Sequence, residues 1–237
     1  LSWRPQAVKR RLNSPWLTLA VIASTPLHCV WHCQLGQIWS RTAKKNNLHI
    51  LTDDTSKFQN CSCYQYTRNV FSYYEKIKFI LDLSKKYNQR ITYLDVDWIH
   101  GYNTENEFDE STLYSYNVIG LSDKTTIPRW YTDFEIKMRN GLLLKQINYE
   151  GVIREYIPEA LISLPVHKDI DNMIKDSKVL QSFLETYYNT HTETHPRLNR
   201  YKKYGIGYAE GWGISALCIK YNIPTSKKIS WKWKNII

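Results

Sequence analysis

Short apolar runs alternate with longer amphipathic stretches along the first hundred residues. The runs at residues 16–23, 48–52 and 90–94 are rich in β-branched, leucine or aromatic side chains, as expected of strands buried in a sheet. Ser, Thr and Pro open the stretch 25–45 or directly precede it, which favours a helix start. Residues 70–86 carry apolar side chains at helical spacing, with lysines 76, 78, 85 and 86 expected on the solvent face. This alternation predicts an α/β fold with a mainly parallel sheet.

The second half of the chain has a less regular pattern. Residues 116–121 and 157–164 are expected to form strands, and residues 131–144 a helix or a strand–turn–helix. Helical periodicity returns at 171–188 and at 210–221. The residues between these two helices predict a polar, basic loop over 189–203, and Cys61 and Cys63 are expected in a loop of the first half.

No linker rich in Gly, Ser or Pro divides the chain. We therefore predict one domain over residues 1–237, in which residues 1–15 are a flexible basic arm. No run of eighteen apolar residues is present, so the sequence predicts no transmembrane segment and a cytoplasmic or membrane-peripheral protein.

The composition is basic and aromatic. Lys and Arg number 32 against 22 Asp and Glu, a formal charge of +10, and nine Trp and eighteen Tyr accompany them. Such a chain attracts nucleic acid, an anionic membrane surface or phosphate-bearing substrates. The five Cys are odd in number and form no C-x-x-C pair, which argues against a disulfide scaffold and a structural zinc site.

The strongest chemical signal is the pair Asp95 and Asp97, which follows the apolar run Ile91-Thr-Tyr-Leu. A spacing of two places both carboxylates on one side of an extended chain at the end of a strand. Mg²⁺ and Mn²⁺ prefer hard oxygen ligands and share their shell with diphosphate oxygens. Ligands of parallel sheets bind beyond the carboxyl ends of the strands. The pair therefore predicts a Mn²⁺ or Mg²⁺ site with a bound diphosphate, whereas the plainer alternative is a turn cap or a surface ion pair.

This pattern resembles the nucleotide-sugar glycosyltransferases of the GT-A fold, particularly small glycogenin-like members and members that build capsule or lipopolysaccharide. The resemblance spans roughly residues 17–224 and is most specific at Tyr93–Trp98. It implies a Rossmann-type mixed, mostly parallel sheet flanked by helices, with a nucleotide-sugar-binding half at 16–100 and an acceptor-binding half at 101–237. It also implies transfer of a sugar from a nucleotide sugar, mainly a UDP-sugar, to a glycan, glycolipid or protein acceptor.

The resemblance assigns roles to individual residues. Asp97 would bind the metal, and Asp95 the metal or the ribose. Ser24 and Thr25 would lie near the nucleotide and Asp53 near its base. Lys78 is one of several lysines that could reach the diphosphate.

A second candidate site surrounds Glu210 in Tyr208-Ala-Glu-Gly-Trp212-Gly. By the same resemblance Glu210 would be the general base of an inverting enzyme, or else it only caps a helix. The neighbouring glycines would let a substrate approach the backbone. Trp212 would form a platform for a sugar ring or pack in the core. His191 and His195, in the predicted basic loop, are possible further metal ligands.

Two other classes of function remain open. A metal-dependent nuclease or nucleotidyltransferase also uses paired carboxylates, with Asp133, Glu135 or Asp171 as a third acidic residue. A noncatalytic nucleic-acid-binding protein is supported by charge and aromatic content alone, and because no zinc-finger, RNP-type or helix-turn-helix signature is present we expect no specific nucleic-acid partner. A peripheral contact with an anionic membrane is compatible with the net charge.

Overall fold

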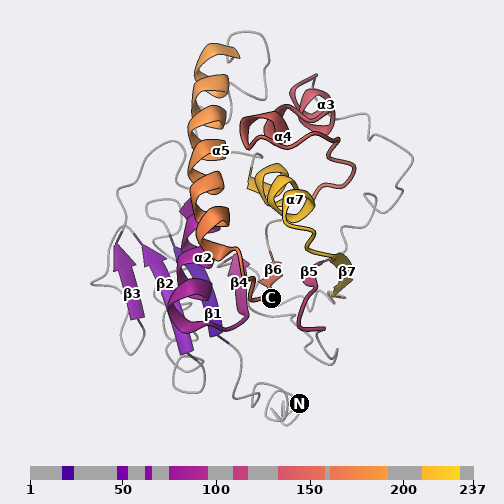
Figure 1. Cartoon of the computed structure of the whole chain (residues 1–237). Helices are drawn as coiled ribbons and strands as arrows, with labels where there is room; N and C mark the ends of the chain where they lie inside the picture. The colour runs from indigo at the N-terminus through magenta and orange to yellow at the C-terminus, as the bar shows by residue number, and fades with distance from the viewer. Residues whose placement is uncertain are drawn as a thin grey trace, which may run out of the picture.

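A mixed sheet organises the part of the chain that the computed structural model describes, namely residues 18–23, 47–52, 62–65, 75–95, 109–116, 133–157, 161–191 and 210–229. Within these ranges seven strands pair in the order β3-β2-β1-β4-β6-β5-β7 (Figure 1). The strands are β1 (Thr18–Ala23), β2 (Asn47–Thr52), β3 (Ser62–Gln65), β4 (Ile91–Asp95), β5 (Leu113–Tyr116), β6 (Leu161–Leu164) and β7 (Thr225–Ile229).

The strands run mostly in one direction. The pairs β2–β3, β1–β2, β1–β4 and β5–β7 are parallel. Strand β6 is antiparallel to both of its neighbours, β4 and β5, and is thus the one reversed strand of the described sheet. The predicted mixed, mostly parallel α/β sheet is confirmed. We call the side where β1, β2 and β4 end the carboxyl edge and the opposite side the amino edge.

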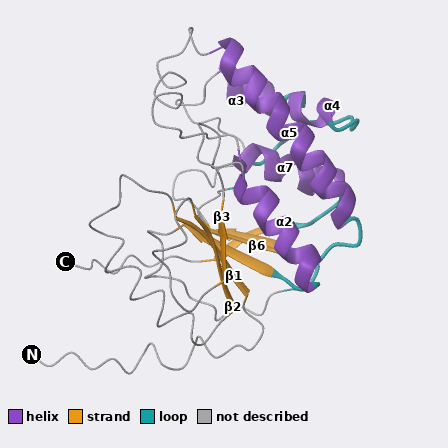
Figure 2. Ribbon diagram, turned by 90° about the vertical axis from the view of Figure 1, so that its left-hand side faces the viewer, coloured by secondary structure: helices purple, strands orange, loops and turns teal. Residues whose placement is uncertain are grey.

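The described helices all lie on one face of this sheet (Figure 2). They are α2 (Glu75–Tyr87), α3 (Asp133–Arg139), α4 (Leu142–Gln146), α5 (Ile170–His191) and α7 (Glu210–Lys220). Among them, no helix combines the length and the apolar character that crossing a membrane requires. The helix predicted over 25–45 lies outside the described residues.

The core lies between the sheet and this helical layer. Helix α2 buries an apolar stripe that includes Ile77, Ile80 and Leu81, each at most 3% exposed, and packs on α5, whose Leu180 and Leu184 belong to the same core. Burial of each such side chain contributes about 1.5–3 kcal/mol, so the periodic apolar positions of α2 and α5 explain why both helices stay on the sheet.

The three strands predicted in the first half agree closely with the structure. The runs 48–52 and 90–94 match β2 and β4, and the described part of the run 16–23 matches β1. The loop prediction for Cys63 was wrong, because Cys63 lies in β3 and pairs in register with Ile50. Strand β3 has four residues, too few for alternation to be seen in the sequence.

The second half departs further from the predictions. The stretch 131–144 contains two helices instead of one, separated at Gly141, whose φ of 93° is a left-handed conformation that other residues rarely adopt. Of the strand expected at 116–121, only Tyr116 is among the described residues, as the last residue of β5, which begins at Leu113. The loop expected from residue 189 begins later, since α5 continues to His191.

Candidate functional site

The two aspartates predicted to bind metal begin at the carboxyl edge of the sheet. Asp95 is the last residue of β4, and its Cα pairs with that of Ile22 in β1. In the next pair of strands, Ala23 and Thr52 are the last residues of β1 and β2 and lie opposite each other. Three neighbouring parallel strands therefore end at nearly the same level. The side chain of Asp95 and the whole of Asp97 lie outside what the structure describes.

The residues predicted to bind the nucleotide follow the same strand ends. Ser24 directly follows Ala23 and precedes Thr25, and Asp53 directly follows Thr52. All three lie outside the described residues. The strand ends that precede them in the sequence, Ala23 and Thr52, lie at the edge where Asp95 ends β4.

The order of the strands marks a particular place on this edge. From β1 the chain adds β2 and then β3 on one side, and returns through α2 to add β4 on the other side of β1. The strand order thus reverses between β1 and β4. In open α/β sheets ligands bind outside the carboxyl ends of the strands at such a switch point. Asp95 stands at this point.

A buried lysine, Lys76, lies close to the same strand end. It belongs to the first turn of α2, is 1% exposed, and its Nζ lies 4.8 Å from the centroid of the Tyr93 ring. Tyr93 is two residues before Asp95 in β4. An ammonium group is rarely buried unless other groups compensate its charge, and the face of an aromatic ring supplies part of that compensation.

The prediction that Lys76 faces solvent was wrong, and a signal in the sequence could have corrected it. Ile80 and Leu83 follow Lys76 by four and seven residues, so the lysine falls on the apolar stripe of the helix. The apolar spacing was sufficient to place Lys76 in the core, although its charge suggested the surface.

Lys78, the lysine predicted to reach the diphosphate, is occupied differently. Its Nζ donates to Oδ2 of Asp82 at 2.9 Å, one turn further along α2, and both side chains are partly exposed. The hydrogen bond to Asp82 raises the pKa of the Lys78 ammonium, against the smaller effect of its partial burial.

Glu210, the predicted general base, begins α7, so its predicted place at a helix start is confirmed. The backbone next to it, at Gly211, packs against Tyr156 and Ile157. Four residues beyond Ile157 in the sequence, Leu161 begins β6 and pairs with Leu94 of β4. The start of α7 is therefore on the carboxyl-edge side of the fold, the side where Asp95 lies. The Glu210 side chain is outside the described residues.

Trp212 packs in the core. It is 1% exposed and meets Tyr156 edge to face, with ring centroids 5.2 Å apart. This burial favours the core-packing alternative for Trp212 over a sugar platform. The glycines next to Glu210 were predicted to let a substrate approach the backbone. For Gly211 this is corrected, because a Cβ there would collide with the Tyr156 ring and the Ile157 carbonyl. Gly211 lets two parts of the protein approach each other.

Of the acidic residues considered for a nuclease site, Asp171 lies at the wrong edge. Its carboxylate pairs with Lys85 in the last turn of α2 at 2.5 Å. The strand before α5, β6, ends with Leu164 opposite Ile91, at the start of β4. Asp171 is therefore at the amino edge and cannot be a third ligand beside Asp95. Asp133 and Glu135 lie in α3, and their side chains are outside the described residues.

A second group of titratable side chains joins β2, β3 and α2. His49 is 3% exposed, and its Nδ1 lies 3.2 Å from the hydroxyl of Tyr64. The rings of His49 and Tyr87 lie 4.9 Å apart, and Lys86 stands over the rings of both tyrosines. Burial, followed by the positive charge of Lys86, lowers the pKa of His49 to about 4. His49 is thus a neutral packing residue at physiological pH.

The sequence predicted two histidines as possible further metal ligands. The predicted loop ligand His191 is the last residue of α5, and His195 is outside the described residues. Within the described ranges, no three His, Cys, Asp or Glu side chains are grouped in a way that could hold a metal ion.

No protein-family model matches this chain, and no curated protein is significantly similar to it.

Proposed function

We propose that this protein is a metal-dependent glycosyltransferase that uses a nucleotide sugar, with its donor site at the carboxyl edge between β1 and β4. The observation that carries the proposal is the position of Asp95. It ends a central parallel strand at the point where the strand order reverses, and Asp97 follows it by two residues. Switch points of this kind bind nucleotides, and paired carboxylates bind the divalent ion that accompanies a diphosphate.

The residues around this point suit a diphosphate. Carboxylate oxygens of Asp95 and Asp97 are the hard ligands that Mn²⁺ and Mg²⁺ prefer, and Lys76 adds a cation next to the same strand. A bound metal ion would neutralise the charge that develops on the leaving diphosphate. Lys76 replaces Lys78 in this proposal, because Lys76 is buried next to β4, whereas Lys78 is partly exposed and pairs with Asp82.

The start of α7 supplies the other half of the reaction. In an inverting transfer, Glu210 accepts the proton of the acceptor hydroxyl while that oxygen forms a bond to the anomeric carbon of the donor sugar. The bond from this carbon to the diphosphate breaks, and the nucleoside diphosphate leaves. UDP-sugars are the favoured donors, GDP-sugars are the alternative, and the acceptor is a glycan, glycolipid or protein.

Binding of nucleotides tests the donor site without knowledge of the acceptor. Calorimetric titration of UDP, GDP, CMP and their sugars, with and without Mn²⁺, should show one class of nucleotide that binds only with the metal. Asp97→Ala should abolish this binding, and Lys78→Gln, which changes a neighbouring surface charge, should preserve it.

The outcomes separate the functional classes. Metal-dependent binding of one nucleotide that is lost in Asp97→Ala would support the proposed site and identify the donor class. If the folded protein bound none of these nucleotides and instead bound DNA with a strong dependence on salt, the glycosyltransferase proposal would be wrong.

A further inference from the structure

A cavity is present beside α7 and β7. Its volume is about 330 Å³, near the lower end of the range of about 300–1,000 Å³ for pockets that bind small molecules. It lies between the segment 152–157, the second half of α7 and the start of β7. Thr225, on its wall, begins β7 and pairs with Leu113, the first residue of β5, so the cavity reaches the amino edge.

The described lining of this cavity is mainly apolar. Val152, Ile157, Ile219 and Ile223 contribute aliphatic side chains, and Cys218 contributes a buried thiol. Burial raises the pKa of the Cys218 thiol to about 12, so this part of the wall carries no charge at neutral pH. The hydroxyl of Ser215, also on the wall, donates to the carbonyl of Gly211 at 2.8 Å and accepts from the amide of Ile157 at 3.1 Å. This hydroxyl is already bonded within the protein.

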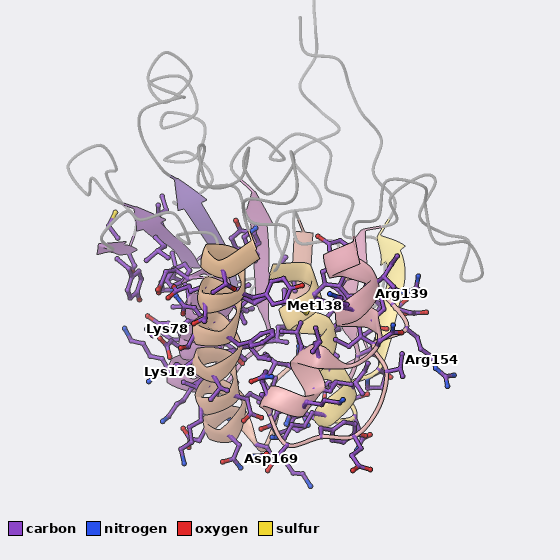
Figure 3. The ribbon with its side chains drawn as sticks, turned by 90° about the horizontal axis from the view of Figure 1, so that it is seen from above. Lys78, Met138, Arg139, Arg154, Asp169 and Lys178 are labelled. Carbon is purple, nitrogen blue, oxygen red and sulfur yellow. The ribbon has the colours of Figure 1, made fainter. Side chains whose placement is uncertain are left out.

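The two charged side chains at the cavity, Glu155 and Arg154, differ in whether they have a partner in the described structure. Glu155 accepts a hydrogen bond from Thr225 Oγ1 at 3.4 Å and has a further interaction. Arg154 is exposed and makes no hydrogen bond or ion pair to any residue of the described structure. Figure 3 shows it at the periphery of the molecule. The cavity therefore combines an apolar interior with one guanidinium group that has no partner among the described residues.

We propose that this cavity binds a small amphiphile with one apolar body and one carboxylate, such as a medium-chain fatty acid. The apolar body would displace water from Val152, Ile219 and Ile223, which is the main source of affinity in such pockets. The carboxylate would pair with Arg154, since a guanidinium group forms two parallel hydrogen bonds with a carboxylate. The volume fits a single chain of moderate length and is too small for a two-chain phospholipid.

The test uses three probes that differ only in the head group: decanoate, decanol and decylamine, each below the concentration at which it aggregates. Calorimetric titration of the full chain should show saturable one-to-one binding of decanoate, weaker binding of decanol and the weakest binding of decylamine. Arg154→Gln should weaken decanoate binding about tenfold and leave decanol binding unchanged, because only the carboxylate uses the guanidinium group. Lys178→Gln is the matched control, since Lys178 is an exposed cation on α5, on the other side of the molecule in Figure 3.

A second variant tests the wall of the cavity. Val152 is 49% exposed, so Val152→Asp should fold normally while it places a negative charge at the cavity. It should weaken decanoate more than decanol. The proposal is overturned if wild-type protein shows no saturable binding of decanoate, or if Arg154→Gln binds decanoate as tightly as wild type. Nucleotide binding at the carboxyl edge is expected to be unchanged in both variants, so the outcome is independent of the proposed glycosyltransferase function.

Discussion

The two ends of strand β4 carry charged residues that serve different purposes. At the amino edge, the guanidinium group of Arg90 donates to the backbone carbonyls of Asp109, Thr112 and Ser163, at 2.5, 2.9 and 3.0 Å. These bonds tie β4 to β6 and to the turn before β5. At the carboxyl edge, Asp95 ends the strand at the switch point. Charge alone therefore does not mark a functional site. The edge of the sheet at which the charged residue lies distinguishes Arg90, a structural group, from Asp95, a candidate ligand.

The largest expected effect is that of Asp95→Asn, at the carboxyl edge, on nucleotide binding. It keeps the shape of the side chain and removes the charge that would hold the metal ion, so Mn²⁺-dependent nucleotide binding should fall by about 100-fold or more. The melting temperature should stay the same or rise, because removal of one carboxylate relieves repulsion from Asp97. Calorimetry and thermal unfolding measure the two effects. Wild-type nucleotide affinity in this variant would assign Asp95 a structural role.

Arg90→Ala, at the amino edge, should instead affect the stability of the fold. Loss of the guanidinium group leaves three backbone carbonyls without their charged donor, which should lower the free energy of unfolding by about 3 kcal/mol. Arg90→Lys should recover part of this loss, since one ammonium group cannot reach all three carbonyls in the fixed geometry of a guanidinium group. Urea unfolding measures the change. A loss below about 0.5 kcal/mol, as for an ordinary surface substitution, would show that these hydrogen bonds contribute little.

Acid should weaken the fold through His49 at the β2–β3 side of the sheet. Its pKa is about 4 in the folded protein, against an ordinary value of 6.5. Between these pH values the unfolded chain binds the proton and the folded protein does not, so stability falls as the pH drops from about 6.5 to 4. The loss from this residue is at most about 3 kcal/mol. Stability at neutral pH is unaffected by this equilibrium.

His49→Gln isolates this contribution from the carboxylates that titrate over the same range. The difference in unfolding free energy between the variant and wild type, measured in urea at several pH values, should narrow as the pH falls from 6.5 to 4. A difference that stays constant would mean that His49 is protonated equally readily in the folded and unfolded chain.

The success of the predictions from sequence also differs between parts of the molecule. Strands β2 and β4 were predicted within one residue, because a short apolar run between polar segments is a local signal. The switch point was not predicted. It depends on β4 pairing with β1, and the paired residues Val21 and Leu94 are distant in sequence. The division of residues 131–144 into two helices depends on Gly141, whose missing side chain lets the Gly151 carbonyl approach.

In the candidate site too, features that depend on a local pattern could be predicted, and features that depend on distant contacts could not. The place of Asp95 at the end of a strand was predicted, because a short motif and a strand are both local signals. The position of Glu210 on the carboxyl-edge side depends on contacts of Gly211 with Tyr156 and Ile157, which no local pattern contains. The burial of Trp212 depends on the same contacts. Residue types alone could not decide between a surface platform and a core residue.

Lys76 and Lys78 test which lysine belongs to the donor site, because they lie two residues apart on α2 and differ in their surroundings. Lys76→Met keeps an unbranched side chain of similar length in the core and removes the cation next to β4. It should weaken metal-dependent nucleotide binding about tenfold, the effect of a change of about 1.4 kcal/mol. The fold should be preserved, since methionine fills irregular spaces in cores.

Lys78→Met is the matched control. It removes only the pair with Asp82, a contribution of about 0.2–0.5 kcal/mol to the helix, and should leave nucleotide binding unchanged. Calorimetry on both variants decides which lysine belongs to the site. If Lys78→Met weakened binding while Lys76→Met did not, the pair with Asp82 would have to open on binding and the buried lysine would be structural. If Lys76→Met alone weakened binding, burial next to β4, and not exposure on the helix, would mark the functional lysine.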